Sequence, residues 1–262
     1  YEEDGVIYSR GILDNKGPIL SCLYALTALK RLGIKPEREV RIIFGCDEES
    51  GFEDLKYYLD YEKAPIAGFT PDCKYPVVYA ERGRAVIKVK ADLDHLITFM
   101  NKYILNTQNK GERLGIDYKN DEFGQLEIRN YHLTKEDFSF SISYPAGITL
   151  EEILDQLNRI EGYEYEVVSH FKPVYFDKKA PMVEIMKETY EYVTGNDGTP
   201  VTTTGGTYAK MMPHIVPFGP SFPGQKGIGH NPNEWMTRED LITNAKIYAL
   251  TLYQLSRKET EL

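Results

Sequence analysis

The sequence predicts an α/β fold, a mostly parallel sheet with flanking helices, into which a smaller ferredoxin-like βαββαβ domain is inserted. Over residues 6–46 a strand-like segment, an amphipathic helix and an apolar strand follow one another, which is typical of a right-handed βαβ unit. From residue 84 the pattern changes to strands and helices in the order βαββαβ, and after residue 171 the first pattern resumes. We therefore expect one domain at residues 1–83 and 172–262 and an inserted domain at 84–171.

The composition is that of an ordinary globular chain. Of the 262 residues, 42% are hydrophobic and 27% are charged, and the length allows one large domain or two smaller ones. No apolar run is long enough to cross a bilayer, and the net charge of −9 opposes binding to nucleic acid or to an anionic membrane. Three cysteines without regular spacing indicate reduced thiols, so we expect a soluble, cytoplasmic protein. The chain opens on Tyr1 without a methionine and enters a strand almost at once, so we expect a fragment of a longer protein.

The first helix follows a loop at residues 9–17. Pro18 suits a first helical turn and Gly33 suits a C-terminal cap, so the sequence predicts a helix over residues 18–32. The apolar run at residues 40–46 then predicts a buried parallel strand. The other elements expected before the insertion are a helix at 52–62 and short strands within 67–72 and at 77–79.

The inserted domain and the chain after it show the same kinds of pattern. Thr149 and Glu152 have the spacing of a capping box at the start of a helix expected over residues 149–159. The other elements expected in the insertion are strands at 85–89, 125–130, 138–144 and 163–170 and a helix at 93–105. After it we expect helices at 181–193 and 238–255 and strands at 200–204 and 215–218.

The main functional signal stands at the end of the apolar run at 40–46. Asp47, Glu48 and Glu49 follow it directly, and ligands of open α/β sheets bind outside the carboxyl ends of the strands. A solvated acidic turn is the alternative explanation. This stretch alone favours neither.

Three further residues are expected on the same rim. Asp14 lies in the loop before the first helix, Asp72 follows a short strand, and His230 lies in the loop before the last helix. A single loop histidine is more often structural or merely exposed than a ligand. Its expected convergence with several carboxylates favours a functional site.

In their order and context these residues resemble the M20 family of metallopeptidases, and most closely its dipeptidase branch, the PepV-like or Xaa-His dipeptidases. Any one of the matching segments is a weak signal, whereas all of them in the family's order are a specific one. They span almost the whole chain outside the insertion. The segments are RGILDNKGP at 10–18, DEESG at 47–51, GFTPD at 68–72, AERG at 80–83, GGTYAK at 205–210 and HNPNE at 230–234.

The resemblance implies a site for two divalent metal ions, either Zn²⁺ or Mn²⁺, with Co²⁺ as a further option. By it, Asp14 bridges the two ions. Glu49 and His230 complete the shell of one ion, and Asp72 contributes to the other. Glu48 is left as the general base that acts on a metal-bridged water.

The resemblance also implies a substrate-binding segment. Lys210 stands where the family carries a basic residue, often arginine, that receives the terminal carboxylate of the substrate, and Gly206 and Thr207 precede it. A lysine supplies a point charge but not the bidentate geometry of arginine. The domain at 1–83 and 172–262 would be the catalytic, metal-binding domain, and the insertion at 84–171 would be its lid.

Two departures from the family pattern bear on activity. The family's first metal motif, a histidine followed two residues later by an aspartate, is absent and is expected to lie before Tyr1. The insertion is also short and lacks the histidine-bearing segment expected near residues 91–92. We therefore expect weak or no activity from the chain as it stands.

The function expected is that of a metal-dependent dipeptidase, which hydrolyses the peptide bond of short peptides with a free N-terminus. One alternative keeps the chemistry and changes the substrate to an N-acyl amino acid or a longer peptide, as in an N-acyl amino acid deacylase or an aminoacyl- or carboxypeptidase. The other is a catalytically silent relative that binds peptide or metal. The sequence leaves open the metal, the side-chain preference and the oligomeric state.

Overall fold

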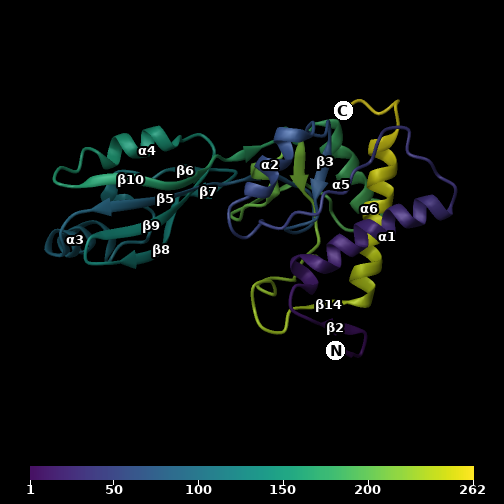
Figure 1. Ribbon diagram of the computed structural model, residues 1–262, viewed down its shortest axis with the longest axis horizontal. Helices are drawn as coiled ribbons and strands as arrows, with labels where there is room; N and C mark the ends of the chain where they lie inside the picture. The colour runs from purple at the N-terminus through teal and green to yellow at the C-terminus, as the bar shows by residue number, and fades with distance from the viewer. The chain divides into compact units, whose positions relative to one another are not determined.

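The computed structural model describes residues 1–262, and the chain divides into two compact units (Figure 1). The first unit comprises residues 1–79, 176–201 and 207–262, and the second comprises residues 80–175 and 202–206. No helix in either unit combines the length and the apolar character that a membrane span requires. The assignment of the units as a catalytic domain and a lid stays a prediction.

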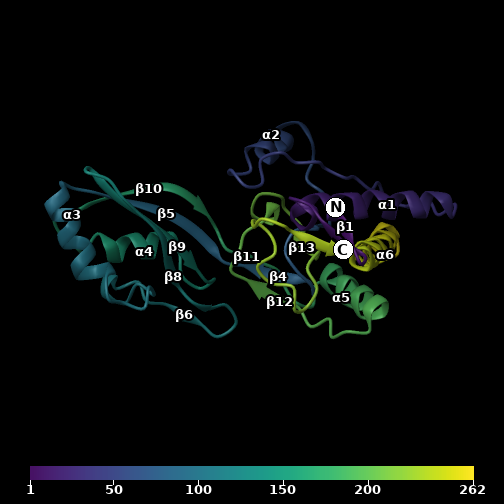
Figure 2. The same cartoon turned by 90° about the horizontal axis from the view of Figure 1, so that it is seen from below.

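The first unit contains the longest helices of the chain. Its long helices are α1 (Gly17–Arg31), α2 (Glu53–Tyr61), α5 (Pro181–Thr194) and α6 (Arg238–Ser256), and its short turns are η1 (Ile12–Lys16) and η4 (Tyr208–Lys210). In both views α1, α5 and α6 lie together (Figure 2), and their apolar faces share one buried cluster that includes Ala25, Met186 and Tyr248.

Local sequence signals set the ends of these helices. Pro18 stands in the first turn of α1, where its missing N–H costs no helical hydrogen bond. Gly33 follows the helix with a φ of 72°, a left-handed conformation that glycine adopts without strain. Thr237 and Asp240 form a capping box at the start of α6.

The strands of the first unit form small sheets, and so do the strands at the points where the chain passes from one unit to the other. Strands β1 (Glu2–Glu3), β2 (Val6–Tyr8) and β14 (Trp235–Thr237) form an antiparallel sheet in the order β1-β2-β14. Strands β3 (Gly68–Thr70) and β13 (Ile215–Pro217) form a parallel pair. Strands β4 (Val78–Glu81), β11 (Val174–Tyr175) and β12 (Val201–Thr203) form a sheet in the order β11-β4-β12.

The mostly parallel sheet expected from the sequence is therefore not what forms. Residues 40–46 have no regular secondary structure, and Phe44 is 61% exposed, although the apolar run predicted a buried strand. A strand needs a neighbour whose N–H and C=O groups complete its ladder, and no segment of this chain supplies one to residues 40–46. The expected βαβ unit is absent for the same reason, and β2 pairs antiparallel with β1 and β14 instead.

The second unit is built on one antiparallel sheet. Its strands are β5 (Gly83–Lys90), β8 (Glu127–Leu133), β9 (Asp137–Tyr144) and β10 (Glu164–Phe171), in the spatial order β10-β5-β9-β8. Helix α3 (Leu93–Phe99) continues into the turn η2 (Met100–Ile104) after β5, and α4 (Leu150–Leu157) follows β9. The remaining short elements are η3 (Glu112–Leu114), β6 (Lys119–Asn120) and β7 (Gly124–Gln125).

Periodicity explains the core of this unit. Ala85, Ile87 and Val89 alternate along β5 and are fully buried, as expected for a strand with one face against a core. Helix α4 buries Ile153 and Leu157 in the same apolar cluster. The capping box predicted at the start of α4 is confirmed.

Candidate metal centre

Three of the four predicted metal ligands converge in the first unit. Nε2 of His230 lies 2.7 Å from Oδ2 of Asp14 and 2.7 Å from Oε1 of Glu49. One ligand atom from each residue lies within 4.8 Å of those of the other two. Two carboxylates and one imidazole at this spacing form a donor set that suits a single divalent ion such as Zn²⁺.

Three separate segments bring these side chains together. Asp14 lies in η1, directly before α1, and is partly buried. Glu49 lies in the acidic turn, residues 47–49, which residues 50–52 connect to α2. His230 lies in the loop between β13 and β14, where its φ of 62° places it in the left-handed region. Glu49 and His230 are exposed, so the cluster is open to solvent on one side.

Charge and burial together shift the pKa values of the cluster. Burial raises the pKa of Asp14, the Glu49 carboxylate raises it further, and His230 opposes both. Burial alone would lower the pKa of His230, but Glu49 and Asp14 together outweigh it and hold that pKa above its ordinary value. A proton on His230 would compete with a metal ion for the same nitrogen.

The structure keeps Asp72 near this region but outside the three-residue cluster. Asp72 is partly buried and follows β3 by two residues. Nδ2 of Asn15 donates a hydrogen bond of 2.6 Å to the carbonyl oxygen of Pro71. The loop of Asp14 is thereby tied to the segment that carries Asp72.

The acidic turn that carries Glu48 is held by its own network. Oδ2 of Asp54 accepts hydrogen bonds from the backbone N–H groups of Cys46 at 2.6 Å and of Asp47 at 3.1 Å. The hydroxyl of Tyr208 donates to the same oxygen at 2.6 Å. Glu48 is partly buried, and its charge contributes to the raised pKa of Tyr208 after burial and the Asp54 hydrogen bond.

The three predicted substrate-binding residues lie together in the sequence around η4. Thr207 is buried and caps this turn, because its Oγ1 accepts a hydrogen bond from the N–H of Ala209 at 3.2 Å. Gly206 is exposed, and Lys210, at the end of η4, is partly buried. Their role toward a substrate stays a prediction.

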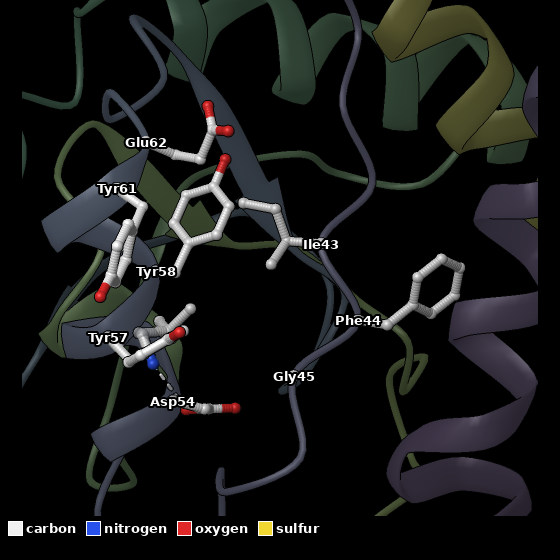
Figure 3. A pocket seen from close by; sticks show the side chains of 9 residues that line it. Ile43, Phe44, Gly45, Asp54, Tyr57, Tyr58, Tyr61 and Glu62 are labelled. Carbon is white, nitrogen blue, oxygen red and sulfur yellow. Dashed lines mark hydrogen bonds between the residues drawn. The ribbon is translucent and has the colours of Figure 1, made fainter.

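A shallow cavity of about 320 Å³ lies beside α2 and contains none of the predicted site residues. Figure 3 shows Ile43 directed toward Tyr58 and Phe44 directed away from the tyrosines of α2. Both residues belong to the run expected to be a buried strand. The cavity therefore lies between residues 43–45 and α2.

Sequence reasoning assigned no role to Glu234, which the structure places next to the cluster. The signal was present, since Glu234 ends the HNPNE segment that begins with His230. Glu234 stands four residues after His230 and directly before an apolar segment. A carboxylate in this position can turn inward and bind the backbone of the His230 loop.

An α/β unit that gathers two carboxylates and a histidine at the ends of its elements defines a candidate hydrolytic enzyme with a metal site. The chain belongs to peptidase family M20/M25/M40, whose sequence profile matches residues 1–254. Members of this family are metallopeptidases, which implies a divalent metal ion.

Similar sequences agree with this assignment. The chain is 24% identical over 364 residues to the Beta-Ala-Xaa dipeptidase of Lactobacillus delbrueckii subsp. lactis, covering 98% of this chain and 77% of that one. The aligned span exceeds the 262 residues of this chain, so the relative carries segments that this chain lacks.

The same α/β fold occurs in human carnosine dipeptidase 1, with a TM-score of 0.71 and 15% identity over 98% of this chain and 74% of that one. A tripeptidase from Staphylococcus aureus matches with a TM-score of 0.68 and 18% identity, over 97% of this chain and 75% of that one. At these identities the likeness establishes the fold alone.

Proposed function

We propose that this chain is a metal-dependent dipeptidase that hydrolyses the peptide bond of short peptides with a free N-terminus. The observation that carries the proposal is the approach of Asp14, Glu49 and His230, whose ligand atoms lie within 4.8 Å of one another in a member of a peptidase family. The names of two similar proteins, a Beta-Ala-Xaa dipeptidase and a carnosine dipeptidase, support dipeptides as the substrate class.

The donor set fits the metal that the family implies. Two carboxylate oxygens and an imidazole nitrogen bind Zn²⁺, Mn²⁺ or Co²⁺, and the ligand types do not choose among them. Asp14, Glu49 and His230 would hold one ion, and Asp14 and Asp72 would contribute to a second. Bound divalent metal supplies a Lewis acid that lowers the pKa of a water molecule and polarises the scissile carbonyl.

Glu48 is the residue we assign to proton transfer. It adjoins the ligand Glu49 in the acidic turn, so the two glutamates can divide ligation and base catalysis. Glu48 would take a proton from the attacking water and pass it to the leaving amine. Lys210 would hold the terminal carboxylate of the peptide, with Gly206 and Thr207 in the same substrate-binding segment.

We further propose that the second unit is a ferredoxin-like lid, with residues 84–171 as the lid and residues 1–83 and 172–262 as the catalytic domain. The sheet order β10-β5-β9-β8, with one helix after β5 and one after β9, supports this assignment. The chain would have low activity, because only Asp14 and Asp72 remain for a second ion.

The test is to titrate the purified chain with Zn²⁺ and with Mn²⁺ and then to assay it. Substrates would be β-alanyl and ordinary α-dipeptides, with N-acetyl amino acids as the comparison. We expect metal binding, and slow dipeptide hydrolysis that a chelator removes and added metal restores. Faster cleavage of N-acetyl amino acids would assign the chain to deacylases. Metal binding without hydrolysis of any substrate would indicate a catalytically silent relative, and failure to bind either metal would refute the proposal.

A further inference from the structure

Glu234 is a buried carboxylate that joins two of the loops on which the candidate metal centre depends. Its side chain is completely buried, and it stands directly before β14. It lies four residues after His230 in sequence and 220 residues after Asp14, yet it contacts the backbone of both.

The contacts of Glu234 divide between the two loops. Oε2 accepts hydrogen bonds from the backbone N–H of Gly11 at 2.8 Å and of Asp14 at 3.5 Å. Oε1 accepts from the backbone N–H of His230 at 3.2 Å and from Nη1 of Arg10 at 2.7 Å. Two of these four donors are the N–H groups of predicted metal ligands.

The Glu234 carboxylate can be buried only because hydrogen-bond donors surround it. A buried charge is strongly unfavourable unless it is paired and hydrogen-bonded, and the two oxygens of Glu234 receive donors from both loops and one cation, Arg10. Gly11 contributes through its backbone, with a φ of 78° that glycine tolerates. Moving either loop would remove donors from a carboxylate that water does not reach.

The distance between the side chains of Asp14 and His230 depends on how Glu234 holds their two backbones. Their contact of 2.7 Å is made by exposed or half-buried side chains, whose backbones need a fixed separation for one ion to reach both. Groups that orient metal ligands without touching the metal typically change metal affinity about 10–100-fold when they are removed.

We propose that Glu234 is a positioning residue, which fixes the loop of Asp14 against the loop of His230 and thereby sets the affinity of the centre for a divalent ion. The inference rests on the proposed metal site. It differs from a general stabilising role, because a residue that only stabilised the fold would change the free energy of unfolding without a selective effect on metal binding.

The test compares Glu234→Gln with Glu239→Gln, a matched change at an exposed position in the first turn of α6. Glutamine keeps the size of the side chain but turns an NH₂ group toward backbone donors. Zn²⁺ affinity, measured by titration calorimetry at one pH, should fall about 10–100-fold in Glu234→Gln and stay unchanged in Glu239→Gln. Amide exchange in metal-free protein should accelerate at residues 9–16 and 228–235 and not in α5.

Glu234→Asp is the second variant, in case Glu234→Gln does not fold. It keeps the charge and shortens the reach, so its Zn²⁺ affinity should lie between those of the wild type and Glu234→Gln. Equal affinities in wild type and in a folded variant would overturn the positioning role and leave the proposed function intact. Exchange that accelerates uniformly over the chain would overturn it as well. A wild type that binds no Zn²⁺ would instead refute the proposed metal site itself.

Discussion

The hydroxyl of Tyr208 donates a hydrogen bond of 2.6 Å to Oδ2 of Asp54 and so connects η4 to the first turn of α2. The N–H of Asp47 also donates to the Tyr208 hydroxyl at 3.2 Å. Gly45 leaves room for this ring, because a Cβ there would lie 2.1 Å from the hydroxyl oxygen. The acidic turn is thus held by a residue from the predicted substrate-binding segment.

This connection predicts that Tyr208→Phe loosens the acidic turn. Burial, followed by the Asp54 hydrogen bond, raises the pKa of Tyr208, so its hydroxyl remains a proton donor at neutral pH. Phenylalanine removes the hydrogen bond to the charged Asp54 and the acceptor of the Asp47 N–H, which should lower the free energy of unfolding by about 1.5–3 kcal/mol. Urea unfolding measures the change, with Tyr57→Phe on the exposed side of α2 as the control. Equal midpoints for the two variants would contradict a role for the Tyr208 hydroxyl.

The second prediction separates the two neighbouring glutamates. Glu48→Gln should abolish dipeptide hydrolysis and keep the bound metal, because Glu48 is assigned to proton transfer and Glu49 to ligation. Removal of a general base costs about 10²–10⁴-fold in rate. Assays and metal analysis should be run on Glu48→Gln and Glu49→Gln in parallel. Loss of metal from Glu48→Gln, with retention in Glu49→Gln, would mean that the two roles are exchanged.

Local signals in the sequence predicted much of the helical structure. Pro18 and the capping box of Thr149 and Glu152 act within one turn, so their effect does not depend on distant residues. The convergence of Asp14, Glu49 and His230 was also expected, since each stands in a loop at the end of an element. The two helix starts can be predicted because short-range chemistry decides them, whereas the approach of Asp14, Glu49 and His230 depends on the assembled fold.

Contacts between residues far apart in the sequence could not be predicted in the same way. The run at 40–46 has the hydrophobicity of a buried strand, but burial depends on a partner that the sequence pattern does not name. Glu234 and Tyr208 were missed for a related reason, because their key hydrogen bonds reach residues 154 to 223 positions away. Such contacts follow from the assembled fold and not from local propensity.

A third prediction concerns the substrate's carboxylate. If Lys210 receives it, Lys210→Ala should raise KM for free dipeptides much more than for dipeptides amidated at the C-terminus, while kcat changes little. Lys226→Ala, in the loop between β13 and β14, provides a matched loss of one positive charge. Equal increases in KM for both substrates would leave Lys210 without a role in carboxylate recognition.

A fourth prediction is that the second unit loses stability as the pH falls below about 6.5, because the pKa of His170 is lowered in the folded protein. Nε2 of His170 lies 2.5 Å from the hydroxyl of Tyr144, and burial lowers the pKa of His170 from its ordinary value of 6.5. Glu151 opposes this shift and Lys172 adds to it. The unfolded chain therefore takes up a proton at a higher pH than the folded chain, and this contribution to stability is lost as the pH falls through 6.5.

The measurement for His170 is the urea midpoint at pH 7.5 and at pH 5.5. The decrease in urea midpoint from pH 7.5 to pH 5.5 should be smaller in His170→Gln than in the wild type. His132→Gln, at an exposed histidine on β8, is the control and should retain the full loss. The same loss in all three proteins would show that other groups, and not His170, cause the pH dependence.

The last prediction concerns how many metal ions the chain binds. Asp14, Glu49 and His230 offer three ligand atoms within 4.8 Å of one another, whereas Asp72 is not part of that group. Three protein ligands and a water complete a tetrahedral Zn²⁺ shell, but Asp14 and Asp72 alone do not. Titration calorimetry with Zn²⁺ should therefore find one tight site for each chain. Asp72→Asn should leave this site unchanged, and His230→Gln should weaken it strongly, because only the second variant removes one of the three gathered ligands. Two sites of similar affinity in the wild type, with one of them lost in Asp72→Asn, would mean that a second complete shell forms around Asp72.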